Sequence, residues 1–299
     1  MELHQLRYFV AVADHRSFTR AAEACFVAQP SLSQQIIKLE KELGHSLFDR
    51  LGRKVQLTTA GRVLYEQAVQ VLATVDAAPR LLNETAEAGR LVIGAIPTVA
   101  PYLLPGLLQQ FRGQVPQAEV VIYENLTAEI VRGCCAGEID VGLLALPIEA
   151  DLLEVEPLFR EELRVAVPAQ HPLADKRRVT MADLGRHPFI LLDEAHCLGE
   201  QIVSFCRQQA CLPAVSCRSS QLLTVQELVG LGYGISLVPE MACQQDSSQR
   251  RVYRSLSGVK PLRTIGMIRH RHRHQSRLAE QFQELARSVL GEAGGLQTS

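Results

Sequence analysis

Apolar residues recur at helical spacing in three short segments near the start of the chain. The first segment carries Leu6, Phe9, Val10 and Ala13. The second covers residues 18–25 and follows Ser17, a residue type that caps helix N-termini. The third opens at Pro30, which suits the first position of a helix, and ends before Gly44, a typical C-cap. Its apolar stripe is Leu32, Ile36, Leu39 and Leu43.

The last two helices are joined by a tight turn, which is the pattern of a helix-turn-helix. The second of them begins with polar side chains that can reach base edges in the major groove of double-stranded DNA. The predicted DNA contacts on this helix are Gln29, Pro30, Ser31, Ser33, Gln34 and Lys38. Residues 48–57 then predict a small hairpin, or wing, whose Arg53 and Lys54 meet phosphate or the minor groove.

From Thr58 the pattern changes to one long helix. Its apolar residues follow alternating steps of four and three, the a/d seam of a coiled coil, at Leu64, Ala68, Val71, Val75, Ala78 and Leu82. Such a seam needs a partner helix, so the sequence predicts dimerisation. Pro79 lies inside the seam and is expected to kink the helix or to end its regular part.

After Gly89 short β-branched runs alternate with helical stretches. The predicted strands are 91–96, 119–123, 139–146, 162–167 and 234–238. This alternation indicates an α/β domain of mostly parallel sheets with helices on their faces. Ligands of such folds bind outside the carboxyl ends of the strands, where Pro97 and Thr98 follow the first strand. We therefore divide the chain into a DNA-binding domain (1–58), a linker and dimerisation helix (59–88) and a regulatory domain (89–299).

Composition and charge fit this picture. The chain has 299 residues, of which 47% are hydrophobic and 21% charged, as in an ordinary soluble protein. It shows neither an export signal nor an apolar run of about 18 residues, so we expect a cytoplasmic protein without a membrane partner. The net charge is −1, yet residues 1–62 have a surplus of basic over acidic residues, which favours a polyanionic partner.

The eight cysteines do not form CxxC pairs, so no metal site is predicted, and a cytoplasmic chain is not expected to be held by structural disulfides. Most are interpreted as small buried hydrophobic residues: Cys25, Cys134, Cys135, Cys217 and Cys243. Cys197 and Cys206 differ, because the segment between them is predicted to be helical. On a continuous helix their sulfurs lie on opposite faces and about 13 Å apart along the axis. A bond between them requires the helix to come apart, which is the physical description of a redox switch.

The run of alternating Arg and His at 269–274 also invites a metal-binding hypothesis. Alternate histidines on a strand share a face, but the interleaved cations disfavour a bound metal ion. We interpret the run as the solvated end of a strand before a helix at 276–290, and we expect neither a metal nor a cofactor.

Several segments resemble a known family. The stretch FTRAAEACFVAQPSLSQQIIKLEKELGHSLFDR, followed by LTTAG, is similar to the N-terminal domain of LysR-type transcriptional regulators. The similarity of layout covers the whole chain: a winged helix-turn-helix rich in α-helix, a long linker helix and a two-lobed effector domain like a periplasmic binding protein. Three further segments, IPTVAPYLLP, HCLGEQIVSFC and RTIG, resemble the hydrogen-peroxide-sensing members of that family.

The resemblance implies a transcriptional regulator rather than an enzyme. It also implies that the protein binds double-stranded promoter DNA as a dimer or tetramer. It implies that Cys197 is the peroxidatic thiol, that Cys206 resolves it, and that Thr98, Thr127 and His196 hold the peroxide. RNA polymerase and a glutaredoxin- or thioredoxin-type reductant are the further partners expected. Cys211 and Cys217 lie close in the chain to the pair, so the sequence leaves open which thiol resolves.

The chemistry requires a thiolate, whereas a free thiol is mostly protonated at neutral pH. His196 and the N-terminus of a helix beginning near Cys197 each favour the anion. The thiolate attacks one peroxide oxygen, the other oxygen leaves as water, and the resulting sulfenic acid reacts with a second thiol to form a disulfide. Two alternatives remain: a LysR-type regulator that binds a small metabolite between its lobes, and a thiol peroxidase that consumes peroxide for turnover.

Overall fold

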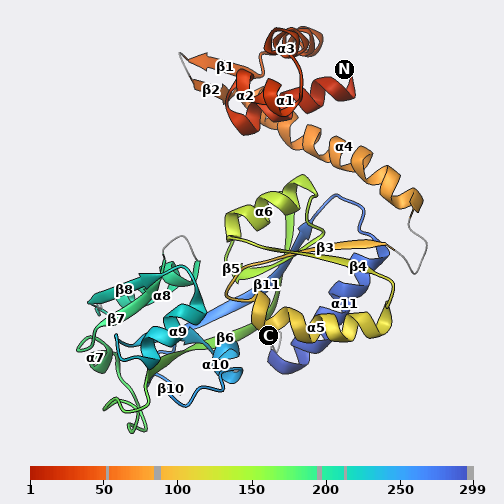
Figure 1. Cartoon of the computed structure of the whole chain (residues 1–299). Helices are drawn as coiled ribbons and strands as arrows, with labels where there is room; N and C mark the ends of the chain where they lie inside the picture. Colours follow the sequence, from red (N-terminus) through yellow and green to blue (C-terminus); the bar gives the residue numbers. More distant parts are fainter. Residues whose placement is uncertain (52–53, 84–88, 194–196, 212–213, 295–299) are drawn as a thin grey trace. The chain divides into compact units, whose positions relative to one another are not determined.

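The computed structural model of this chain describes residues 1–51, 54–83, 89–193, 197–211 and 214–294. It contains two compact units (Figure 1). The N-terminal unit contains Met1–Glu84 and is grouped with Arg271–His274, and the larger unit contains Thr85–His270 and Gln275–Ser299. Within the described ranges, no helix combines the length and the apolar character needed to cross a membrane.

The N-terminal unit is a winged helix-turn-helix followed by a long helix. Its elements are α1 (Leu3–His15), α2 (Phe18–Ala24), α3 (Gln29–Leu43), β1 (Phe48–Leu51), β2 (Lys54–Leu57) and α4 (Thr59–Asn83). The predicted caps are present, since the Ser17 hydroxyl accepts from the backbone N–H of Arg20 and Gly44 ends α3 with a φ of 72°. Pro30 is the second residue of α3 and not the first, because the helix already begins at Gln29.

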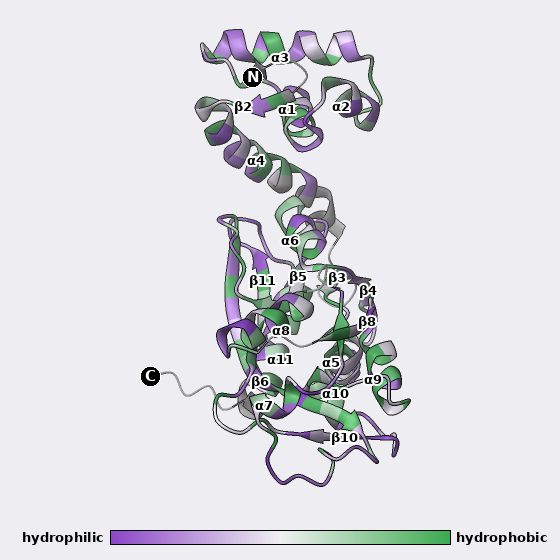
Figure 2. Cartoon of the chain, turned by 90° about the vertical axis from the view of Figure 1, so that its left-hand side faces the viewer, coloured by the Kyte–Doolittle hydropathy of each residue, from purple (hydrophilic) through white to green (hydrophobic). Residues whose placement is uncertain are grey.

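The core of this unit forms where the apolar stripe of α3 meets α1 and the wing. Leu32, Ile36 and Leu39 have no exposed surface, and the rings of Phe9 and Phe48 lie 5.3 Å apart in the same cluster. Figure 2 shows α3 as a helix on which hydrophilic residues alternate with hydrophobic ones. The exposed residues of α3 are mostly polar, although Ile37 is also exposed.

Helix α4 does not present its predicted seam as one continuous apolar face. Ala68 is 1% exposed and packs with Leu64 against the core of its own unit, whereas Val71 and Val75 are 43% and 36% exposed. The first part of the predicted seam is therefore wrong, because its residues fold back on the same chain. The helix also continues beyond Pro79 to Asn83.

The larger unit is an α/β structure whose elements follow one another closely. In chain order they are β3 (Arg90–Ala95), α5 (Ala100–Gln114), β4 (Glu119–Glu124), α6 (Thr127–Ala136), β5 (Val141–Leu146), β6 (Leu153–Pro168), α7 (Met181–Leu184), β7 (Phe189–Leu192), α8 (Cys197–Gln208), β8 (Val215–Ser219), α9 (Leu222–Gly230), β9 (Ser236–Pro239), α10 (Glu240–Gln244), β10 (Arg251–Arg254), β11 (Leu262–His270) and α11 (Arg277–Gly294). The five predicted strands correspond to β3, β4, β5, β6 and β9.

Strand β6 connects two lobes. The sheet has the order β10-β6-β11-β5-β3-β4, and β9 also pairs with β6. The first part of β6 pairs with β11, and its last part pairs with β9 and β10. We call the half with β3, β4, β5, α5, α6 and α11 lobe 1, and the half with β7–β10 and α7–α10 lobe 2. Each lobe has its own hydrophobic core.

The expectation of mostly parallel sheets is wrong. Strands β4, β3 and β5 are parallel, but β6 pairs antiparallel with β9, β10 and β11, and β11 pairs antiparallel with β5. Strands β9, β10 and β11 follow β6 only after long intervening segments, so the alternation of strands and helices along the chain does not determine the direction in which they pair with β6. In lobe 1, α5 and α11 cover one face of the sheet and α6 covers the other (Figure 1).

The Arg/His run is only partly solvated. Arg269 and His270 belong to β11, where Arg269 donates to Glu154 and to Gln283 and His270 is 3% exposed. The interpretation as a solvated strand end is therefore wrong for these two residues, because α11 and β6 cover the end of β11.

The first turn of α8 lies close against the end of β7. A Cβ at Gly199 would lie 2.5 Å from the carbonyl oxygen of Leu192 and 2.8 Å from that of Asp193. Leu198 and Ile202, on one face of α8, are at most 1% exposed in the core of lobe 2. Glycine thus lets the start of α8 approach the β7 backbone.

We expect Gly199→Ala to lower the free energy of unfolding by about 1–3 kcal/mol, because the new methyl group meets backbone atoms that cannot move alone. The matched control is Gly106→Ala in α5, where a Cβ meets no atom within 4 Å. That change should raise stability by roughly 0.5–1 kcal/mol, since alanine favours helix. Thermal unfolding of the two full-length variants checks both signs, and equal stabilities would contradict the close packing of α8.

Candidate functional site

Three neighbouring parallel strands of lobe 1 end at the same edge of the sheet. Thr98 follows β3, and Thr127 opens α6 directly after β4. At the end of β5 the carbonyl oxygen of Leu146 accepts a hydrogen bond from Nε2 of Gln201 at 3.3 Å. Helix α8 of lobe 2 therefore reaches the carboxyl ends of the lobe 1 strands, where α/β folds bind ligands.

Helix α8 directs its two cysteines into different lobes. Cys197 is the first residue of α8, is half-buried and packs against the core of lobe 1. Cys206 is 1% exposed and belongs to the core of lobe 2. Both are free thiols, and the continuous helix between them keeps their positions about 13 Å apart along its axis. Burial raises the pKa of Cys206 to about 11, so this thiol is protonated at neutral pH.

A buried guanidinium joins the lobes beside this site. Arg263 of β11 has no exposed side-chain surface and donates to Oγ1 of Thr98 at 3.0 Å and to its backbone oxygen at 3.1 Å. Its Nε donates to Glu161 of β6 at 2.6 Å. The second oxygen of Glu161 accepts from the backbone N–H of Met241, in α10, at 2.9 Å. The chain of bonds thus runs from lobe 1 to lobe 2.

This arrangement fixes what the Thr98 hydroxyl can do. An arginine only donates, so the Thr98 oxygen is an acceptor in that bond and its own hydrogen is available to another group. A nearby cation also strengthens a hydroxyl as a hydrogen-bond donor. Thr98 can therefore stabilise negative charge that develops on a small molecule at this edge.

Two buried polar atoms of the same region have no hydrogen-bond partner among the described residues: Oγ1 of Thr127 and Oε1 of Gln201. Buried polar groups are nearly always paired in folded proteins. Thr127 follows the end of β4, and Gln201 belongs to α8, where its Nε2 donates to the end of β5. They suit a small polar molecule that can donate and accept hydrogen bonds.

The structure places two of the three residues that were predicted to bind peroxide. Thr98 and Thr127 lie at neighbouring strand ends, whereas His196 is outside the described residues. The sequence reasoning missed Gln201 and Arg263. Gln201 was detectable, because it follows Cys197 by four positions and so shares its face of a helix. Arg263 opens the RTIG segment that carries part of the family resemblance, but its partners Thr98 and Glu161 are far away in the sequence, so no local pattern indicated these contacts.

The prediction that five further cysteines are buried is only partly correct. Cys134 is fully buried, but Cys25, Cys135, Cys217 and Cys243 are half-buried at the edges of the cores. Burial raises the pKa of Cys134 and Cys243 well above the ordinary thiol value, which keeps both protonated.

The predicted DNA-reading residues lie on α3 between Gln29 and Lys38. Gln29, Pro30, Ser31, Gln34 and Lys38 are exposed, and Ser33 is half-buried. Strands β1 and β2 form the predicted wing with antiparallel register. Arg53 is outside the described residues, and Lys54 opens β2.

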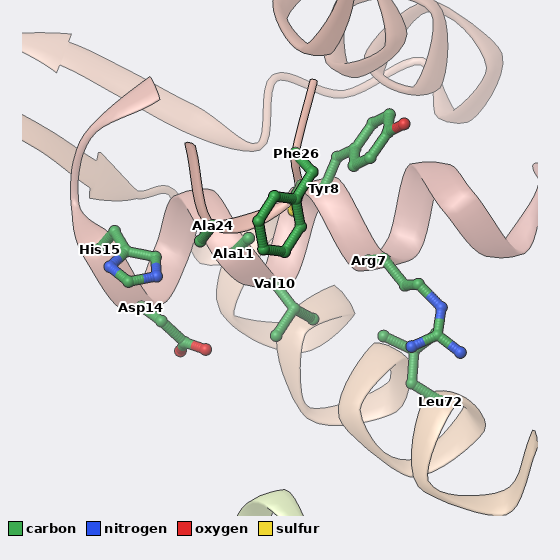
Figure 3. Close-up of a pocket in the computed structure, with 10 residues that line it drawn as sticks. Arg7, Tyr8, Val10, Ala11, Asp14, His15, Ala24, Phe26 and Leu72 are labelled. Carbon is green, nitrogen blue, oxygen red and sulfur yellow. The ribbon is translucent and has the colours of Figure 1, made fainter. Parts of the chain in front are cut away.

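A groove of about 460 Å³ lies beside the helix-turn-helix. Figure 3 shows Phe26 among its lining side chains, with Asp14 and His15 toward one end and Arg7 and Leu72 toward the other. Phe26, in the turn between α2 and α3, is 95% exposed. The groove combines apolar with charged lining and belongs to the N-terminal unit alone.

Comparison with known families identifies the class of protein. Residues 3–62 match the family described as bacterial regulatory helix-turn-helix protein, lysR family, and residues 84–291 match the LysR substrate binding domain. The chain belongs to the LysR family of bacterial transcriptional regulators.

Individual relatives narrow the similarity. The chain is 38% identical over 292 residues to the hydrogen peroxide-inducible genes activator of Dickeya chrysanthemi, covering 97% of this chain and 95% of that protein. It is similar to a full-length cysteine variant of OxyR from Pseudomonas aeruginosa, with a TM-score of 0.67, 32% identity, and 97% and 94% of the two chains covered. A hydrogen-peroxide-bound cysteine mutant of Corynebacterium glutamicum OxyR gives a TM-score of 0.63 at 34% identity, with 99% and 96% covered.

We expect Glu161→Gln to destabilise the larger unit by about 3–5 kcal/mol, because it leaves the fully buried Arg263 without a counter-charge. Glu154→Gln is the control. Its carboxylate pairs with Arg269 but is 48% exposed, so its loss should cost less than about 1 kcal/mol. Denaturant unfolding of both variants measures the difference. Equal effects would show that the buried bridge contributes nothing special.

Proposed function

We propose that this chain is a DNA-binding transcriptional activator that senses hydrogen peroxide by oxidation of Cys197 and formation of a disulfide with Cys206. The observation that carries the proposal is α8, an intact helix that keeps the two thiols in different hydrophobic cores. The disulfide is incompatible with that helix, so oxidation must change the conformation where the lobes meet. Similarity to hydrogen peroxide-inducible activators supports the choice of oxidant.

In the first step the Cys197 thiolate attacks one oxygen of the peroxide. The O–O bond breaks, the sulfur becomes a sulfenic acid, and the other oxygen leaves as hydroxide and takes up a proton to form water. The Thr98 hydroxyl, polarised by Arg263, donates a hydrogen bond to the leaving oxygen. Thr127, Gln201 and His196 orient the peroxide.

In the second step the sulfur of Cys206 attacks the sulfenic sulfur. The S–O bond breaks, the oxygen leaves as water with the proton of the Cys206 thiol, and the disulfide forms. The segment between the two cysteines must leave its helical conformation first, because the helix holds the sulfurs too far apart. Leaving the core also removes the burial that raises the pKa of Cys206.

DNA reading is assigned to the N-terminal unit. Helix α3 enters the major groove with Gln29, Pro30, Ser31, Ser33, Gln34 and Lys38, while Arg53 and Lys54 of the wing contact phosphate or the minor groove. Val71 and Val75, exposed on α4, pair with a second copy, and the dimers assemble into tetramers. Opening of α8 then changes the spacing of the DNA-reading helices.

Further partners complete the cycle. The activator contacts RNA polymerase at the promoter, and a glutaredoxin- or thioredoxin-type reductant restores the thiols in the cytoplasm. We also propose that the DNA-binding domain ends at residue 58 and that the linker and dimerisation helix ends at residue 88. Two alternative functions remain. A LysR-type regulator of a small metabolite would bind its ligand through Thr98 and Thr127. A thiol peroxidase would consume peroxide continuously with a thiol reductant.

The proposal is tested by adding one equivalent of hydrogen peroxide to the reduced full-length protein and mapping its disulfides by peptide mass spectrometry. We expect a Cys197–Cys206 bond and a changed promoter footprint. Both should be absent in Cys197→Ser, while Cys134→Ser, which alters a buried thiol, should respond like the unchanged protein. Identical footprints of reduced and oxidised protein would favour the metabolite alternative, and sustained peroxide removal would favour the peroxidase.

For Thr127 we predict that one substitution keeps or raises the free energy of unfolding but slows the oxidation of Cys197. Thr127→Val removes a buried hydroxyl that has no partner in the described structure, so the free energy of unfolding should stay equal or rise by about 1–3 kcal/mol. The same change should slow oxidation of Cys197 by about tenfold or more, because a group that orients peroxide is lost. Rapid-mixing oxidation kinetics and thermal unfolding measure the two effects. Thr127→Ser is the control, and loss of stability together with unchanged kinetics would assign the hydroxyl a structural role.

A further inference from the structure

The C-terminal end of α8 brings a third cysteine next to Cys206. The helix ends at Gln208, and Ala210 adopts a left-handed φ of 52°. The backbone N–H of Ala210 donates to the oxygen of Arg207 at 3.0 Å, and that of Cys211 donates to the oxygen of Cys206 at 2.9 Å. These two bonds define a Schellman motif, in which the chain folds back over the last helical turn.

The motif limits the distance between the two cysteines. Because one hydrogen bond links the carbonyl of Cys206 to the N–H of Cys211, their Cα atoms are at most about 6.8 Å apart. Disulfides have Cα separations of about 4.4–6.8 Å. A Cys206–Cys211 bond is therefore compatible with an intact α8, in contrast to a bond between Cys206 and Cys197.

The two thiols differ in exposure. Cys206 is buried in lobe 2, whereas Cys211 is half-buried and its Sγ donates to the backbone oxygen of Met181 at 3.6 Å. Burial is the main cause of the raised pKa of Cys206, and the charge of a Cys211 thiolate raises it further. Cys211 is therefore the member of the pair that solvent reaches.

We propose that Cys211 is a nucleophile in this cycle: its thiolate attacks the Cys206 sulfur of the Cys197–Cys206 disulfide and forms a Cys206–Cys211 disulfide. One S–S bond breaks and one forms, and Cys197 leaves as a thiolate. The proton lost by Cys211 is taken up by Cys197, so the exchange needs no further oxidant or reductant. This inference rests on the proposed function.

The exchange runs toward the folded helix. The Cys197–Cys206 bond holds α8 open and exposes Leu198 and Ile202, which are buried when the helix is intact. The Cys206–Cys211 bond joins residues that the helix cap already holds together, so those side chains return to the core. The second disulfide thus restores the conformation of the reduced protein, frees Cys197 and ends the signal while the protein remains oxidised.

Trypsin separates the two disulfides cleanly. Cleavage after Arg186 and Arg207 leaves Cys197 and Cys206 in one peptide, residues 187–207, and places Cys211 in residues 208–218. The first disulfide lies within one peptide, which becomes two hydrogens lighter. The second disulfide links the two peptides.

The test follows both species after one equivalent of hydrogen peroxide, with acid quenching and no reductant, in the unchanged protein, Cys211→Ser and Cys217→Ser. We expect the internal disulfide to form first and to decay as the linked peptides appear. In Cys211→Ser its lifetime should increase at least fivefold. Cys217→Ser is the matched control, a half-buried thiol of the same lobe and the same tryptic peptide, and should behave like the unchanged protein.

A second arm separates this inference from the proposed function. Diamide, a thiol oxidant, is added to Cys197→Ser, in which the first disulfide cannot form. The cap geometry predicts linked peptides there as well. Their absence overturns the Cys206–Cys211 pair, as does an unchanged decay of the internal disulfide in Cys211→Ser. If peroxide yields no internal disulfide in the unchanged protein, the exchange fails together with the proposed function, and a positive diamide arm then shows that the fault lies with the peroxide step.

Discussion

Helical geometry of α8 is the constraint on which the regulatory unit depends. A step of nine residues turns the chain through two and a half turns, so Cys197 and Cys206 leave the helix in opposite directions. One packs against the core of lobe 1 and the other lies in the core of lobe 2. The helix therefore belongs to both lobes, and any event that opens it alters the contact between them.

The buried ion pair of Arg263 and Glu161 holds the two lobes together beside α8. The guanidinium holds Thr98 of lobe 1 and Glu161 of β6, and Glu161 in turn accepts from the backbone of α10. Removing any one partner would leave a charge or a donor buried, which is expensive in a protein interior. The bridge thus ties the lobes beside the strand ends without including a residue of α8, and it also orients the Thr98 hydroxyl.

The local sequence pattern predicted the helices and strands better than it predicted which strands pair with each other. Ser17, Gly44 and the stripe of Leu32 and Ile36 specify their helices through neighbours in the sequence, and the structure agrees. The antiparallel pairing of β9 and β10 with β6 was not predicted, because these strands lie far from β6 in the sequence and no local pattern indicates their direction. The same limit applies to the site: Gln201 shares a helix face with Cys197, whereas Arg263 meets Thr98 across 165 positions.

Burial also sets how rarely the switch opens without oxidation. Exposing Leu198 and Ile202 costs about 1.5–3 kcal/mol for each side chain. Together this cost corresponds to an open population of roughly one molecule in a hundred to one in ten thousand, since 1.4 kcal/mol is a factor of about ten. A reduced Cys206 is therefore both enclosed and protonated for nearly all of the time. Under the proposed mechanism a covalent bond to Cys197 offsets the lost burial, so the conformational signal is tied to the chemical event and not to thermal fluctuation of the helix.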